Sequence, residues 1–150
     1  MYQNIVVAVD SSALARQALT HAVCLARQAQ ATLHVVHVVN MYELVFEDSS
    51  QRDGMKARMM AERHGEEVLT TILSEVDAGT VTHRTKVLEC WGAGSEIAKI
   101  LLSYANEQAA DMMVMGTHGR TGLAHLLMGS VAESVLREAK VPVVIVRAAD

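Results

Sequence analysis

Hydrophobic and polar positions divide the chain into short apolar runs separated by longer stretches with helical spacing. The run Ile5 to Val9, rich in β-branched residues, is typical of a strand buried on both faces of a parallel sheet. Similar runs predict strands over 32–39, 112–115 and 143–146. Residues 81–88 alternate between polar and apolar, which predicts a half-polar strand at a sheet edge.

Between these runs, apolar residues recur with the spacing of one helix face. They predict a helix capped by Ser11 or Ser12, a long helix over about 55–76, and a third helix that starts after 92–95. A fourth helix follows the glycine-rich loop described below. Residues 40–53 show no steady period, so we expect an irregular connection there.

Strands and helices therefore alternate, and this order specifies an α/β fold with a parallel sheet covered by helices on both faces. We expect one Rossmann-like, doubly wound domain over residues 1–150, with five strands in the order 3-2-1-4-5. That order puts the first and fourth strands side by side. Asp10 and the loop that starts at Gly116 then face one crevice, at the carboxyl ends of the strands, where such sheets bind ligands.

Glycines and a serine follow the fourth strand with the spacing G-x2-G-x9-G-S, as Gly116, Gly119, Gly129 and Ser130. Glycine lets backbone N–H groups approach phosphate oxygens that a Cβ would hold off, and a helix N-terminus favours an anion. The loop therefore predicts a nucleotide-binding site. Alternatively, Ser130 and Glu133 form a capping box that only satisfies the N–H groups of its own helix. The two interpretations are compatible, and we favour phosphate binding.

Charged side chains near this loop add candidate chemistry. Asp10 could hold a metal ion on the phosphates or bond a ribose hydroxyl, or else serve as the N-cap of the first helix. His118 and Arg120 lie inside the loop, where either could neutralise phosphate charge.

The usual devices of rapid nucleotide hydrolysis are missing from the sequence. No glycine is followed by Lys-Ser or Lys-Thr, so there is no Walker A motif, and no base or water-positioning residue is evident. His34 and His37, three residues apart on a strand, should project to opposite faces, and the other histidines have no partner at metal-ligand spacing. We therefore expect a protein that holds a nucleotide rather than one that turns it over quickly.

Composition narrows the classes of ligand and the cellular locations to consider. A net charge of -4 and 3% aromatic residues argue against a nucleic-acid surface, which needs cationic side chains and stacking platforms. Cys24 and Cys90 belong to no metal-binding cluster, so we expect reduced, packed thiols. No basic leader precedes the first strand, and no apolar run approaches about 18 residues. These features predict a cytoplasmic protein without membrane insertion.

The whole chain resembles the universal stress protein family. The resemblance is carried by the opening Ile5 to Ser12, the strand Leu33 to Val38, the segment Asp111 to Arg120, and the closing segment from Gly129 to Val146. The G-x2-G-x9-G-S element is similar to that of the family's ATP-binding branch. Ser11 is a departure, since many relatives have glycine after the aspartate, and it alters the turn without removing the site.

This resemblance implies that ATP, or ADP or AMP derived from it, binds with Mg2+ between the first and fourth strands. Ala8 and Asp10 would lie near the ribose and the metal, and Val38 near the adenine. The residues implied to surround the ribose and phosphates are Met115, Gly116, His118, Gly119, Gly129, Ser130 and Val131. The resemblance also implies a homodimer, or a tetramer built from it, formed through the last strand at Val143, Val144, Ile145 and Val146.

The leading functional hypothesis is a regulatory protein in which bound nucleotide biases oligomer formation and contacts with another, unknown protein. One alternative is a slow ATPase or autophosphorylating enzyme, with Ser130 or Thr121 as the phosphate acceptor. Another is a scaffold that binds no nucleotide.

Overall fold

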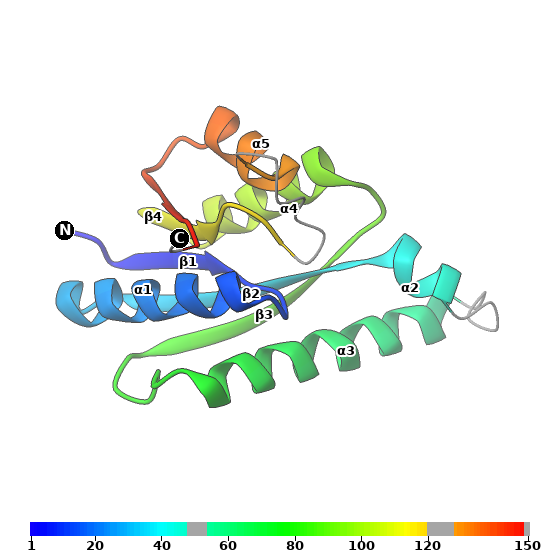
Figure 1. The fold of residues 1–150 in the computed structure, drawn as a ribbon, viewed down its shortest axis with the longest axis horizontal. Helices are drawn as coiled ribbons and strands as arrows, with labels where there is room; N and C mark the ends of the chain where they lie inside the picture. The colour runs from blue at the N-terminus through cyan, green and yellow to red at the C-terminus, as the bar shows by residue number, and fades with distance from the viewer. Residues whose placement is uncertain (48–53, 120–127, 149–150) are drawn as a thin grey trace.

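Five parallel strands form one sheet in the order β3-β2-β1-β4-β5 (Figure 1). The structure is a computed structural model that describes residues 1–47, 54–119 and 128–148. It confirms the predicted α/β fold, the strand order and the position of the half-polar strand at an edge. The strands are β1 (Asn4–Ala8), β2 (Thr32–Asn40), β3 (His83–Cys90), β4 (Met112–Gly116) and β5 (Val143–Val146).

Helices cover both faces of this sheet, as the periodicity predicts (Figure 1). On one face lie α1 (Ala13–Ala29) and α3 (Gly54–Glu75), and on the other lie α4 (Gly94–Glu107) and α5 (Ser130–Glu138). In the described part of the chain, none of the helices is long and apolar enough to cross a membrane.

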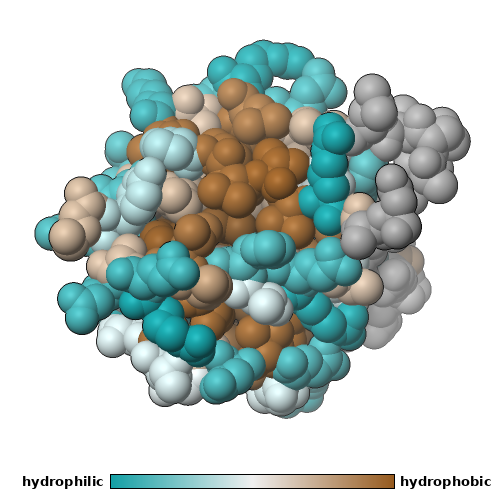
Figure 2. Space-filling model, turned by 60° about the vertical axis from the view of Figure 1, so that its left-hand side comes forward, coloured by the Kyte–Doolittle hydropathy of each residue, from teal (hydrophilic) through white to brown (hydrophobic). Residues whose placement is uncertain are grey.

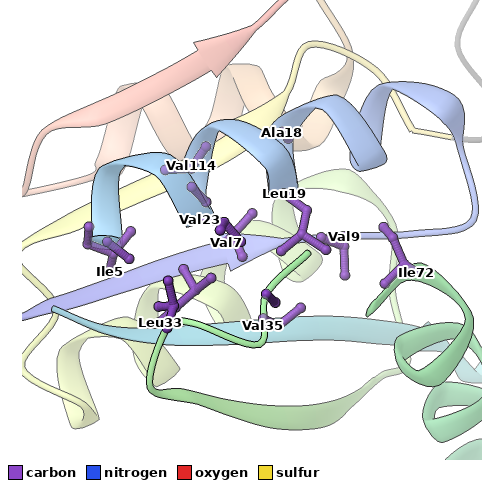
Figure 3. Packing of buried hydrophobic residues seen from close by; sticks show 14 of the residues in the cluster. Ile5, Val7, Val9, Ala18, Leu19, Val23, Leu33, Val35, Ile72 and Val114 are labelled. Atoms are coloured by element: carbon purple, nitrogen blue, oxygen red, sulfur yellow. The ribbon is translucent and has the colours of Figure 1, made fainter. Parts of the chain in front are cut away.

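The larger core lies between α1, α3 and the central strands (Figure 3). Helix α1 starts at its predicted cap, because the Ser12 hydroxyl accepts a hydrogen bond from the Ala15 N–H at 3.1 Å. Its Leu19 and Val23 then point toward the strands and pack with Val7, and all three are buried. Each side chain of this size contributes roughly 1.5–3 kcal/mol when fully buried.

The first half of the segment predicted to be irregular is a helix, so that prediction was wrong. Helix α2 (Met41–Glu47) follows β2 directly, and the side-chain oxygen of Asn40 accepts hydrogen bonds from the N–H groups of Tyr42 and Glu43 at 3.1 and 3.3 Å. Met41 is fully buried and anchors the helix. The rest of that segment, residues 48–53, lies outside the described residues.

His34 and His37 do lie on opposite faces of β2. The His34 ring is 2% exposed, with Nδ1 3.3 Å from the Tyr104 hydroxyl and Nε2 3.3 Å from the Asn4 side-chain oxygen. On the other face, His37 Nδ1 lies 2.8 Å from the carbonyl oxygen of Val9. Burial, and secondly the positive charge of Arg84, lower the pKa of His34.

His34 should therefore make stability depend on pH. Its folded pKa lies below the unfolded value of 6.5, so only the unfolded chain readily takes up a proton as the pH falls below that value. We predict that the free energy of unfolding falls between pH 7 and pH 5, with His34 contributing at most about 1.4 kcal/mol per pH unit. In urea titrations, His34→Gln should show a shallower fall. His21→Gln, at an exposed position of α1, is the control and should keep the wild-type slope; equal slopes for all three proteins would contradict the prediction.

Candidate functional site

A cavity of about 430 Å³ opens at the carboxyl ends of β1, β2 and β4. Of the eleven residues that the sequence assigned to a binding site, Arg120 lies outside the described residues, and so does the alternative acceptor Thr121. The structure brings the other ten together around this cavity: Ala8, Asp10, Val38, Met115, Gly116, His118, Gly119, Gly129, Ser130 and Val131.

At the carboxyl ends of these strands, the cavity extends to both faces of the sheet. On the α4 and α5 side its wall is apolar and includes Val38, Leu101 and Met115. On the α3 side, His37 and His64 line it with their ring centroids 6.3 Å apart.

Sequence reasoning missed this second wall, which also includes Asn40, Glu43 and Leu44. These residues belong to the end of β2 and to α2, the segment predicted to be irregular. The sequence did contain a signal for this helix, because Asn40, a good N-cap residue, directly precedes a short apolar stretch.

Glycines allow the chain to close tightly around the cavity. A Cβ on Gly119 would lie 2.7 Å from an Asp10 carboxylate oxygen, and one on Gly129 would lie 3.0 Å from the Thr117 carbonyl oxygen. No glycine in the described ranges has a positive φ. Glycine is therefore needed here for close approach rather than for a left-handed backbone.

Thr117 fixes the loop to two other elements. Its N–H donates to the Val146 carbonyl of β5 at 3.0 Å, and its carbonyl accepts from the Gly129 N–H at 2.7 Å. The Gly129 N–H is thus already used, so this glycine contributes space to the cavity rather than a donor.

The N-terminus of α5 supplies donors instead. Glu133 is the first residue of α5 whose N–H bonds back along the chain, to the Gly129 carbonyl at 3.0 Å. The preceding N–H groups of Ser130, Val131 and Ala132 therefore have no partner within the helix, and all three residues line the cavity. Together with the helix dipole, they form an arrangement suited to an anion.

The capping-box alternative for Ser130 is wrong. The N-cap is Gly129, which has no side chain to cap with, and Ser130 is already the first helical residue. The Glu133 carboxylate instead accepts a hydrogen bond from Arg137 at 2.7 Å. The helix start is thus left without a side-chain cap at the cavity.

Asp10 is not the cap of α1 either, because Ser12 holds that position. One Asp10 oxygen accepts the Ser12 N–H at 2.8 Å, and the other lies directly beside Gly119, 2.7 Å from where a Cβ on that glycine would be. Mg2+ is commonly held by one or two carboxylates together with phosphate oxygens. A single carboxylate opposite a helix N-terminus fits a magnesium–phosphate group.

The start of α4 packs against the start of α5. A Cβ on Gly94 would clash with the Ser130 hydroxyl oxygen and would lie 2.6 Å from the Ser130 Cβ. We predict that Gly94→Ala lowers the free energy of unfolding by about 1–3 kcal/mol, because the added methyl group overpacks this contact. Urea denaturation measures the change.

Ser130→Gly in the Gly94→Ala background should recover most of that loss, since it removes the atoms that clash. Gly54→Ala is the matched control, because a Cβ there meets nothing within 4 Å. A Gly94→Ala protein as stable as the control would contradict this packing.

Comparison with known proteins identifies the family. Residues 1–147 match the model of the universal stress protein family. The chain belongs to this family. A universal stress protein of Methanocaldococcus jannaschii is 30% identical over 147 residues, covering 98% of this chain and 83% of the relative.

Solved universal stress protein structures share the fold. One from Burkholderia pseudomallei is 31% identical with a TM-score of 0.72, over 98% of this chain and 97% of that chain. One from Archaeoglobus fulgidus in complex with dAMP is 23% identical with a TM-score of 0.66, over 97% and 98%. Another, in complex with cAMP, is 24% identical with a TM-score of 0.61, over 99% and 98%.

Proposed function

We propose that this universal stress protein binds an adenine nucleotide, foremost ATP with Mg2+, as a member of the family's ATP-binding branch. The observation that carries the proposal is the N-terminus of α5, which has no side-chain cap and whose first residues line the cavity at the carboxyl ends of β1 and β4. Ten residues assigned from the sequence surround the same cavity. The relatives bound to dAMP and cAMP support an adenine nucleotide as the ligand class.

The two ends of the cavity suit the two ends of such a ligand. Val38, Leu101 and Met115 offer an apolar wall for the base. Glycine backbone, the N–H groups of α5 and the Asp10 carboxylate suit the phosphates and their magnesium ion. Bound nucleotide would then connect β1, β4 and α5.

Calorimetric titration with ATP and Mg2+ tests this proposal. We predict saturable binding by the wild-type protein and about tenfold weaker binding by Gly119→Ala, because the added Cβ displaces the Asp10 carboxylate. Gly79→Ala is the control, since its nearest contact would be an ordinary 3.8 Å to Asp77. Absence of heat, with no rise of the melting temperature in ATP, would instead support the scaffold hypothesis.

The cavity favours holding the nucleotide over hydrolysing it. Asp10 is tied to Ser12, and the described loop offers no lysine to the phosphates. We predict that incubation with labelled ATP releases no ADP over multiple turnovers and leaves no covalent phosphate by intact-mass measurement. Phosphate on Ser130 or Thr121, or steady ADP release, would establish the enzyme alternative.

We further propose that the protein acts through oligomers assembled on β5, and through contacts with a regulated protein. Strand β5 is an edge strand whose Val143, Val144 and Ile145 are only half-buried. Figure 2 brings forward the side of the molecule on which β5 lies, and apolar side chains gather over a broad area of it. An exposed apolar strand edge favours pairing with another chain.

The ladder between β4 and β5 identifies the open side of that edge. The carbonyl groups of Pro142 and Val146 accept from β4 and its continuation, so the alternate residues Val143 and Ile145 direct their backbone groups outward. Ile145→Pro should therefore remove an outward N–H, leave the pairing with β4 intact, and convert dimers to monomers in light scattering. Ile145→Val keeps the N–H and should remain dimeric. An Ile145→Pro dimer would place the interface elsewhere.

A further inference from the structure

Aromatic side chains are exposed where β2 and β3 end. The chain has one tryptophan, one phenylalanine and three tyrosines. Of these few, Tyr42 and Phe46 of α2 are 49% and 82% exposed, and Trp91, directly after β3, is 54% exposed. Exposed apolar side chains gathered in one place mark surfaces that bind another molecule, and Trp and Tyr are enriched at the centres of such surfaces.

The sheet brings two of these rings together. Asn40 is paired with Cys90 at the ends of β2 and β3, so the residues that follow the two strands are neighbours. The ring centroids of Tyr42 and Trp91 lie 5.3 Å apart with their planes at 89°, so the edge of one ring meets the face of the other. We call these two residues the aromatic pair. Since each is about half exposed, ring faces remain open to a further group.

Ring faces attract cations, because the π electrons give them a partial negative charge. Within residues 1–47, 54–119 and 128–148, no cationic side chain stacks on either ring of the aromatic pair. Arg58 is instead directed to the Glu89 carboxylate, at 3.8 Å, and the charge of Lys99 acts on the carboxyl of Glu96.

A carboxylate lies next to the aromatic pair. The Glu96 side chain packs over Gly92, the residue after Trp91, since a Cβ on Gly92 would lie 2.7 Å from the Glu96 Cγ. Its Oε2 accepts a hydrogen bond from the Ser95 hydroxyl at 3.0 Å, and this bond is the main cause that lowers the pKa of Glu96. Glu96 is therefore ionised at neutral pH, and its charge is complementary to a cation at the pair.

We propose that the aromatic pair is a docking point for a cationic side chain, foremost arginine, of a partner protein. The planar guanidinium of arginine stacks on ring faces and bonds carboxylates, and the pair with Glu96 offers both. Phe46, one helical turn from Tyr42, extends the apolar surface for the rest of the partner's segment. The inference rests on the proposed contact with a regulated protein and adds its place and the partner's chemistry.

The aromatic pair also adjoins the cavity. Asn40 lines the cavity, and its side-chain oxygen accepts the Tyr42 N–H at 3.1 Å. Glu43, the next residue of α2, lines the cavity as well. A partner docked on the pair therefore lies next to the nucleotide site, as a contact controlled by bound nucleotide requires.

Trp91 is the single tryptophan of the chain, so its fluorescence reports binding at the aromatic pair directly. The probes are a short peptide of Gly-Arg repeats and two matched peptides in which lysine or glutamine replaces the arginines. We expect saturable binding of the arginine peptide, about two- to fivefold weaker binding of the lysine peptide, and roughly tenfold or more weaker binding of the glutamine peptide. Equal binding of the glutamine peptide, which needs no charge, or of the lysine peptide, which needs no stacking, would overturn the proposal.

Substitution of the tyrosine separates the ring face from apolar packing. Tyr42→Leu keeps an apolar contact with Trp91 but removes one aromatic face, so the arginine peptide should bind about two- to fivefold more weakly. Tyr2→Leu is the control at another exposed tyrosine and should bind the peptide as the wild type does. Equal affinities of all three proteins would contradict a role of the ring.

Substitution of the carboxylate tests the charge. Glu96→Gln should weaken binding of the arginine peptide about twofold in low-salt buffer. Glu107→Gln is the matched control, because Glu107 lies on the same helix and likewise accepts a serine hydroxyl, that of Ser103 at 3.3 Å. Equal losses in both variants would indicate general attraction to an acidic surface and would overturn the docking point. This comparison decides the question if Tyr42→Leu fails to fold, as judged by its melting temperature.

The outcomes separate this inference from nucleotide binding, because the peptide titrations contain no nucleotide. Trp91 emission that does not respond to the arginine peptide would overturn the docking point and leave ATP binding intact. A positive peptide titration by a protein that binds no ATP would overturn the nucleotide proposal alone.

Discussion

The site depends on close packing of the glycine backbone at the carboxyl ends of the strands. Gly129 lies against the Thr117 carbonyl, Gly119 against the Asp10 carboxylate, and Gly94 against Ser130. Because these positions carry no side chain, the end of β4 and the starts of α4 and α5 meet at one crevice. A side chain at any of them would clash with its neighbour and disturb the way these elements meet.

Sequence patterns predicted the fold well where the elements are long or fully buried. Alternation of strands and helices was enough for the strand order, and β5 begins and ends where its apolar run does. Helix α2 was missed because seven residues are too few to show a period, and its stability depends on burying Met41. At Ser130, the local capping pattern was misleading because the bond from Gly129 to Thr117 places the helix start one residue earlier.

The candidate site was predictable on one side only. The glycine loop is one contiguous motif, and Asp10 directly follows the first apolar run, so both can be recognised in the sequence. The opposite wall draws His37 and His64 from different elements, so no spacing along the chain reveals that they meet. Thr117 was also overlooked, although it connects the loop to β5 through Val146 and thus links the cavity to the strand proposed to pair with a second copy.

The central claim is that backbone amides at the cavity receive the phosphates of an adenine nucleotide, and amide NMR tests it most directly. Titration with ATP and Mg2+ should shift the Gly119, Ser130 and Val131 amide resonances strongly, and titration with adenosine should leave them nearly unmoved. The amide of Gly79, in the turn after α3, should not respond to either ligand. Saturable ATP binding without shifts at those three amides would contradict the account.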